Sequence, residues 1–129
     1  MAAMTCTYNE LNVGGVKGGD GSVVRYSWNN LDATNNVGNS ISFAQWADRS
    51  VQFNGVFNNC TVVWEGSNDD GVTWTTLNDA FGAAISKTAA ALTQVTEVSQ
   101  LARPRVNTAG VNTSITVAAL LRRATPMRT

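Results

Sequence analysis

The chain has 129 residues and no net formal charge, since nine Lys and Arg balance nine Asp and Glu, and it contains two Cys and no His. This length suits a single domain with a small core. Without His, neither a Ser-His-Asp nor a Cys-His catalytic system can be built, and two cysteines supply too few ligands for the commonest zinc sites. No apolar run approaches the roughly 20 residues of a membrane helix. Balanced charge also gives no basic field for nucleic acid. We therefore expect no cofactor, no metal, no nucleic acid and no membrane partner.

The first residues, Met1–Cys6, lack the basic and apolar regions of a signal peptide. In a chain without an export signal, Cys6 and Cys60 are expected to remain free thiols, with one disulfide between them as the alternative. Cys60 precedes an apolar segment and is expected to pack as a small hydrophobic residue.

Charge is sparse and unevenly distributed. Charged residues make up 14% of the chain, well below the usual quarter. Residues 1–79 carry eight acidic and three basic side chains, a net charge of −5, whereas residues 80–129 carry one acidic and six basic, a net of +5. A compact fold would interleave the two halves. The alternative is a surface with opposite poles, suited to head-to-tail contact between subunits.

Residues 1–21 end in a glycine-rich stretch, Gly14–Gly21, with five glycines in eight positions. Such a stretch does not hold a helix or a long strand. We interpret residues 1–21 as a flexible N-terminal arm, which is either a linker or a segment that orders on a neighbouring subunit. At the other end, the basic segment Arg122–Thr129 follows the last expected strand, with residues 124–129 as a short C-terminal tail.

Between these ends, Val, Thr and aromatic residues alternate with polar ones at a period of two, and Asn and Gly interrupt the pattern about every ten residues. This pattern predicts strands. The expected strands are Val24–Trp28, Ile41–Phe43, Val51–Phe53, Thr61–Glu65, Val72–Leu77, Ala83–Thr88, Leu92–Val98, Leu101–Val106 and Ser114–Leu121. Residues 22–123 are thus predicted to form one all-β sandwich of about eight strands, jelly-roll-like or Greek-key. The predicted core contains Val24, Phe43, Phe53, Val63, Trp74, Ile115 and Val117.

The alanine-rich segment Ala83–Leu92 leaves a second interpretation, because alanine is the best helix former. Residues 79–101 would then hold a helix of two or three turns. The β-type residues Thr93–Val98 favour strands instead.

One motif is sharp: Ser67, Asp69, Gly71, Thr73 and Trp74 fit the pattern S-x-D-x-G-x-T-W. It resembles the Asp-box hairpin of sialidases and many β-sandwich proteins. An Asp side chain can bond the backbone of its own turn, and Asp-Gly supplies the positive φ that a hairpin needs. We therefore interpret Ser67, Asp69, Gly71 and Trp74 as a structural hairpin, with Trp74 packing near Trp64.

Three functional alternatives attach to the same region. Asn68, Asp69 and Asp70 offer oxygen ligands for calcium, although the spacing of an EF-hand is absent. A glycosidase would need a carboxylate pair, but no two acids stand out, and Glu65 and Asp69 are the positions at which replacement by Ala would test for such an activity. Four tryptophans suit a sugar-binding platform as well as a core, and Trp46 is the best candidate for an exposed one.

The stretch from Thr61 to Asp79, with its strand, G-S-N-D-D-G turn, strand and L-N-D ending, resembles the central hairpin of small virion proteins of tailed bacteriophages. The similarity continues through Leu101–Val106, with its R-P-R-V sequence, and the closing strand Ser114–Arg123. Together with the less distinct match at Val51–Phe53, it covers residues 50–123. The resemblance implies a capsid decoration, or cement, protein: a β-sandwich on the outer shell that bridges subunits of the major capsid protein. That family carries no catalytic residues, so the resemblance implies none here.

The sequence therefore predicts a non-enzymatic virion protein, made in the host cytoplasm and located on the outer capsid surface. Its expected partners are the major capsid protein and further copies of itself, with a trimer favoured over a dimer by the resemblance. Arg122, Arg123 and Arg128 are the candidate subunit contacts. The alternatives are a phage tail or fibre component and a carbohydrate-binding module of β-sandwich type.

Overall fold

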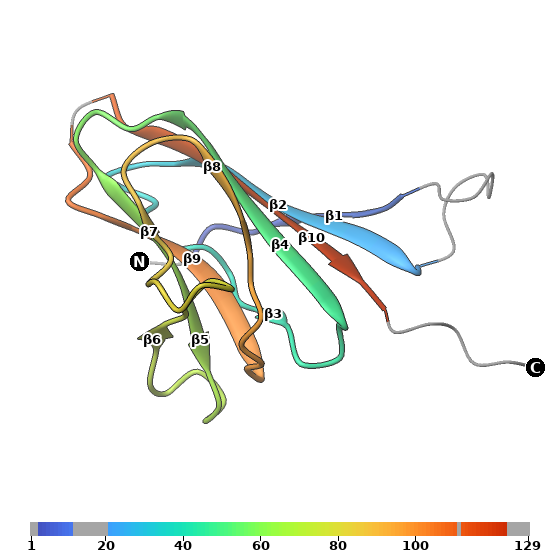
Figure 1. Ribbon diagram of the computed structural model, residues 1–129. Helices are drawn as coiled ribbons and strands as arrows, with labels where there is room; N and C mark the ends of the chain where they lie inside the picture. The colour runs from blue at the N-terminus through green and yellow to red at the C-terminus, as the bar shows by residue number, and fades with distance from the viewer. Residues whose placement is uncertain (1–2, 12–20, 111, 124–129) are drawn as a thin grey trace, which may run out of the picture.

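A computed structural model describes residues 3–11, 21–110 and 112–123, and in this part of the chain it contains strands and no helix. The strands form two antiparallel sheets that lie face to face (Figure 1). The ten strands are β1 (Thr7–Glu10), β2 (Val23–Leu31), β3 (Ile41–Ser42), β4 (Asp48–Val56), β5 (Thr61–Ser67), β6 (Thr75–Thr76), β7 (Ser86–Lys87), β8 (Ala91–Gln94), β9 (Leu101–Asn107) and β10 (Ser114–Arg122).

Each sheet has five strands. The sheet with the longer strands, which we call the larger sheet, has the order β1-β2-β10-β4-β8, and the smaller sheet has the order β3-β9-β5-β6, with β7 also paired to β5. Apart from β1 and β7, this is the order of an eight-stranded jelly roll, in which most connections carry the chain from one sheet to the other. The predicted all-β sandwich is confirmed, and its topology is the jelly-roll-like one. A helix within residues 79–101 was the wrong alternative, because Ile85 and Val95 bond the backbones of Leu77 and Arg49 instead of their own segment.

Long strands form where the alternation is regular. In β10, Ile115, Val117, Ala119 and Leu121 are buried and the residues between them are not. The predicted strands Val72–Leu77 and Ala83–Thr88 shrink to two residues each in β6 and β7. Both flank Asp79, whose carboxylate bonds the backbone of its own turn and so competes with the sheet.

The core lies between the sheets and centres on Trp64 of β5. Its ring makes edge-to-face contacts with Trp28 and Phe43, at centroid distances of 5.6 Å and 5.7 Å. Six of the seven predicted core residues are buried: Val24, Phe43, Phe53, Val63, Ile115 and Val117. Trp74 is the exception. It is half-buried on the outside of the smaller sheet, and Trp64 packs against Trp28 and Phe43 rather than against Trp74.

Trp46 is also a correction, because it is buried, with 5% exposure, where the sequence predicted an exposed ring. Its indole N–H donates to the carbonyl of Ser42 over 3.1 Å. The short β3–β4 connection folds this ring inward, and alternation cannot predict the direction of a side chain outside a strand.

Part of the predicted N-terminal arm is a strand of the sandwich. Within residues 1–21, Thr7–Glu10 form β1 and pair with β2, so this segment belongs to the sandwich. The prediction for the glycine-rich stretch falls mainly on residues 12–20, outside the described residues, as does the tail of residues 124–129. Arg122 is the last residue of β10 rather than the first residue beyond it.

Both cysteines are free thiols, and Cys60 is fully buried in the core. The described residues include no helix that is long and apolar enough to cross a membrane.

Candidate functional site

The turn between β5 and β6 brings the four predicted hairpin residues together. The Ser67 hydroxyl donates to Asp69 Oδ1 over 2.7 Å and accepts from the Gly71 N–H over 2.9 Å. Asp69 Oδ1 also accepts from the Thr73 N–H over 2.9 Å, and the Trp74 indole donates to the Gly71 carbonyl over 2.9 Å. The motif therefore closes on itself, and each of its polar groups serves the turn.

Backbone geometry explains the glycine in the motif. Asp70 and Gly71 both have positive φ, at 60° and 87°, and such a pair reverses the chain tightly. A Cβ atom at Gly71 would lie 3.4 Å from the Trp74 ring, so a side chain there would be strained by φ rather than by space.

The turn is also tied to the segment that precedes β9. Asn68 Oδ1 accepts from the Gln100 N–H over 2.8 Å, and the Gln100 amide donates to Asp70 Oδ1 over 2.6 Å. The Asp70 N–H in turn donates to Gln100 Oε1 over 3.0 Å. The three oxygen-bearing residues that the sequence offered for calcium thus already accept hydrogen bonds from the protein.

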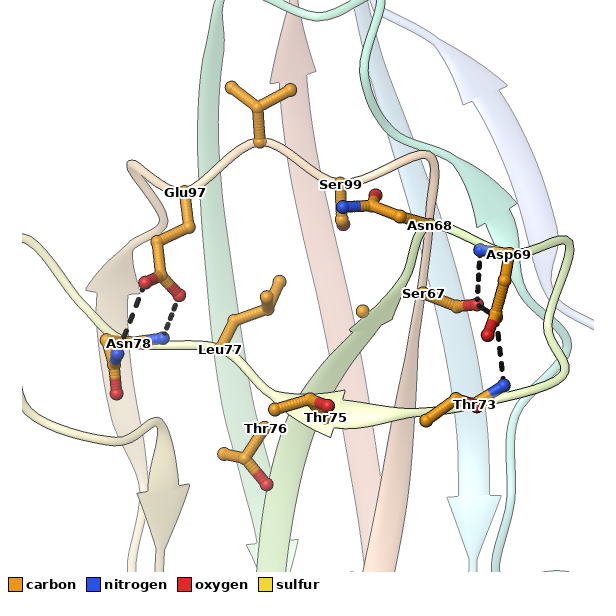
Figure 2. Close-up of a pocket in the computed structure, with 12 residues that line it drawn as sticks. Ser67, Asn68, Asp69, Thr73, Thr75, Thr76, Leu77, Asn78, Glu97 and Ser99 are labelled. Atoms are coloured by element: carbon orange, nitrogen blue, oxygen red, sulfur yellow. Dashed lines mark hydrogen bonds between the residues drawn. The ribbon is translucent and has the colours of Figure 1, made fainter.

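An open groove of about 690 Å³ lies beside this turn. Figure 2 shows Leu77 and Ser99 between the turn on one side and the Asn78–Glu97 pair on the other. Glu97 accepts from the backbone and side-chain amides of Asn78, over 2.6 Å and 3.2 Å. The groove is lined mainly by hydroxyl and amide groups and by no aromatic ring.

The chemistry available in this groove is hydrogen bonding. Its two carboxylates, Asp69 and Glu97, are both engaged by neighbouring donors. The Thr73 backbone N–H, followed by the Ser67 hydroxyl, holds the pKa of Asp69 below its ordinary value, so this group is a poor general acid. Across the residues that the structure describes, no three of His, Cys, Asp and Glu gather closely enough to hold a metal ion.

A charged cluster lies on the outer face of the smaller sheet. Glu65 of β5 is only 2% exposed, and it accepts from Arg103 Nε over 2.7 Å and from Arg105 Nε over 3.1 Å, both on β9. Arg103 also lies over the Trp74 ring, with 4.0 Å between the guanidinium carbon and the ring centroid. This cluster uses Glu65 as a bridge between strands, away from the groove beside the hairpin.

The structure places two of the three predicted contact arginines. Arg122 Nε donates to Asp48 over 2.7 Å on the outer face of the larger sheet. Arg123 Nε donates to the Gly21 carbonyl over 2.8 Å, and its guanidinium lies 5.6 Å from the Trp46 ring centroid. Both groups are therefore engaged within the chain. Arg128 lies outside the described residues.

Two features were missed from the sequence. Arg49, buried inside the sandwich, donates to the carbonyls of Trp46, Val95 and Thr96. Phe81 is 96% exposed at the tip of the β6–β7 connection. The apolar run Ala80–Ala84 was the available signal for the second feature, but only Ala83 and Ala84 were assigned, to the predicted strand Ala83–Thr88.

Comparison of this chain with protein-family models, with curated proteins and with solved structures finds no match.

Proposed function

We propose that this protein is a non-enzymatic virion protein that decorates the capsid of a tailed bacteriophage and bridges subunits of the major capsid protein on the outer surface of the shell. The proposal combines the sequence resemblance of residues 50–123 with a jelly-roll topology, an architecture found in viral shell proteins and also in lectins. Because the fold is shared by unrelated functions, the choice between them has to come from the surface.

The observation that carries the proposal is the open outer face of the larger sheet. The strand register aligns Ser27, Ala118 and Gln52 in one row across this face, and Thr116 and Asn54 in the next. Small, mostly uncharged side chains on a broad sheet can approach another protein closely over a wide area, with many weak hydrogen bonds. Such a face suits a bridging role better than capture of a small molecule.

The distribution of charge supports the same role. Glu65 forms ion pairs with both Arg103 and Arg105, Asp48 pairs with Arg122, and Arg49 bonds backbone carbonyls. These charges stabilise the protein itself, which leaves a surface of low charge density. Electrostatic capture of nucleic acid needs the opposite arrangement, a field of unpaired basic groups.

The carbohydrate-binding alternative depended on an exposed tryptophan platform. Trp28, Trp46 and Trp64 are buried, and Arg103 occupies one side of Trp74. The open groove beside the hairpin offers hydroxyl and amide groups but no ring on which a sugar could stack. We therefore favour the decoration protein over this alternative.

The test uses shells of the virion in which the protein is found, stripped of it or assembled without it. Purified protein is added, the shells are sedimented, and the bound copies per shell are counted. We expect saturable binding at high copy number. Thr116→Arg on the outer face of the larger sheet should abolish binding, because it places a long charge at the centre of the contact. Thr61→Arg, the same exchange on the outer face of the smaller sheet, is the matched control and should bind normally.

A few copies per particle that follow purified tails would instead identify a tail or fibre component. Release of sugar from glycan substrates that disappears in Asp69→Ala or Glu65→Ala would identify an enzyme. Either result would contradict the proposal, as would equal loss of binding in both arginine variants.

A further inference from the structure

The connection between β6 and β7 exposes five consecutive apolar residues. Ala80, Phe81, Gly82, Ala83 and Ala84 all lie in solvent, and Phe81 is 96% exposed. Isolated exposed apolar residues are normal on a protein surface. A continuous exposed run with an aromatic residue is not, and it indicates a contact with another molecule. We call residues 80–84 the Phe81 tip.

The Phe81 tip is held rigidly by Asp79. The Asp79 N–H donates to the Ala83 carbonyl over 2.7 Å, and the Gly82 N–H donates to the Asp79 carbonyl over 3.0 Å. Asp79 Oδ1 accepts from the N–H groups of Phe81 and Ala83, over 2.9 Å and 3.0 Å. A positive φ of 82° at Gly82 completes the reversal. Because the loop is already ordered, docking of Phe81 costs little backbone entropy.

The same chain carries a groove with apolar walls that can receive such a ring. It has a volume of about 550 Å³ and lies on the outer face of the larger sheet, between β2, β10, β4 and β8. Its apolar walls are Val23, Leu92 and Leu120, and the two leucines are 70% and 43% exposed. We call this site the Leu92–Leu120 groove.

The charges that border the Leu92–Leu120 groove are already satisfied. Asp48 and Arg122 pair with each other at one end. Arg49 turns inward and donates to the carbonyls of Trp46, Val95 and Thr96. An uncharged ring could therefore enter without leaving a charge unpaired, which is the main penalty for burying an apolar group beside ions.

We propose that the Phe81 tip of one copy docks in the Leu92–Leu120 groove of a second copy, so that the chain assembles head to tail. Phe81 is almost fully exposed, so the ring does not occupy the groove of its own chain. A tip and a groove are unlike surfaces, so their contact is heterologous unless two copies exchange tips about a two-fold axis. Heterologous contacts give a closed ring when the rotation between neighbours allows it. The inference concerns self-assembly and does not rest on what the assembled protein attaches to.

A second copy explains the tip better than a membrane does. The base of the tip is acidic, with Asp79 at its start and Glu97 bonded to the adjacent Asn78. These carboxylates would be repelled by anionic lipid, and the tip itself contains no Lys or Arg. The groove, in contrast, presents exposed leucines with no covering element among the described residues.

The test measures the mass of the full-length protein in solution, by light scattering or sedimentation velocity at several concentrations, without capsids. We expect the wild type to have at least twice the 13.7 kDa mass of one chain. Phe81→Ser and Leu92→Asp should each reduce it to one chain. Val72→Ser is the matched control: Val72 is 82% exposed but belongs to the other turn, so this variant should assemble like the wild type.

Mixing the two variants makes the test specific for this pair of surfaces. Phe81→Ser keeps an intact groove, and Leu92→Asp keeps an intact tip, so the mixture contains one functional combination. We expect species of two chains and no larger ring. Leu92→Asp changes a residue of β8 and could disturb folding, whereas Phe81→Ser changes only an exposed loop. The loss of assembly in Phe81→Ser therefore tests the contact even if Leu92→Asp does not fold.

A wild-type protein that is a single chain at all concentrations would overturn the proposal, as would assembly that survives Phe81→Ser. A monomeric wild type whose binding to capsid shells or to anionic vesicles is lost in Phe81→Ser would assign the tip to that partner and would equally contradict self-assembly. Failure of capsid binding by an assembled wild type would instead count against the proposed function alone.

Discussion

Arg103 and Glu65 connect the Asp-box-like turn to the sheet beneath it. The same guanidinium that donates to Glu65 over 2.7 Å lies 4.0 Å from the centroid of Trp74, at the end of the turn. Trp74 is therefore held from outside the core, by contact with a cation that is itself paired with a buried carboxylate. The motif is rigid because the sheet supplies this support, in addition to its own hydrogen bonds.

Glu65→Gln should destabilise the protein. The amide has one acceptor oxygen and no charge, so it cannot serve both Arg103 and Arg105, and two charge-assisted hydrogen bonds are weakened. We expect a loss of about 2–3 kcal/mol in the free energy of unfolding, measured by urea denaturation. Asp48→Asn is the control. Asp48 and its partner Arg122 have side chains that are 53% and 65% exposed, so this loss should stay below about 1 kcal/mol. Equal losses in the two variants would show that Glu65 is not a special bridge.

Arg49→Lys should be costly although charge and length are nearly kept. The guanidinium donates to three carbonyls from three different nitrogens, and it lies 5.1 Å from the Phe43 centroid. One ammonium group cannot reach all three carbonyls in that geometry, so buried acceptors lose their donor. We expect a loss of about 2–3 kcal/mol. Arg25→Lys, at an exposed position of β2, should change stability by less than about 0.5 kcal/mol.

The sequence predicted the sandwich because its long strands carry a clear period of two. Val51 and Phe53 in β4, and Ile115 and Val117 in β10, alternate strictly and are all buried. The hairpin was predictable for a different reason. The contacts of Ser67, Asp69 and Gly71 join residues that are close in sequence, so the motif alone determines the structure of the turn.

The failures share a cause as well. Trp46 and Trp74 lie outside regular strands or at their ends, where the direction of a side chain depends on distant partners such as Ser42 and Arg103. The burial of Arg49 could not be predicted from the sequence, because its three hydrogen-bond acceptors are backbone carbonyls, which any residue type supplies. The β1 strand was missed because a glycine-rich stretch follows it, and composition was averaged over both.

The two thiols should differ in reactivity. Burial raises the pKa of both Cys6 and Cys60, which disfavours the reactive thiolate. Cys6 is only half-buried, whereas Cys60 is fully buried in the core. In a native protein at neutral pH we expect one thiol to react slowly with a disulfide reagent and the other to react only on unfolding. Cys6→Ser should remove the first phase and Cys60→Ser the second. If no thiol reacts even after the protein is unfolded without reductant, the two cysteines form a disulfide, which would contradict this prediction.

The last prediction concerns acid. The Thr73 backbone N–H and then the Ser67 hydroxyl stabilise ionised Asp69, so its pKa in the folded protein lies below the ordinary value of 3.8. An acid with a depressed folded pKa stabilises the fold at pH values above its unfolded pKa, and this contribution is lost as the pH falls through the folded pKa. Asp69→Asn keeps an acceptor oxygen at the same place but cannot ionise. At neutral pH the wild type should be the more stable protein, and the difference should shrink as the pH falls below about 4. Chemical denaturation of both proteins across this range measures the difference directly, and other titrating groups cancel because the two chains share them. A difference that stays constant down to low pH would show that the charge of Asp69 does not support the turn.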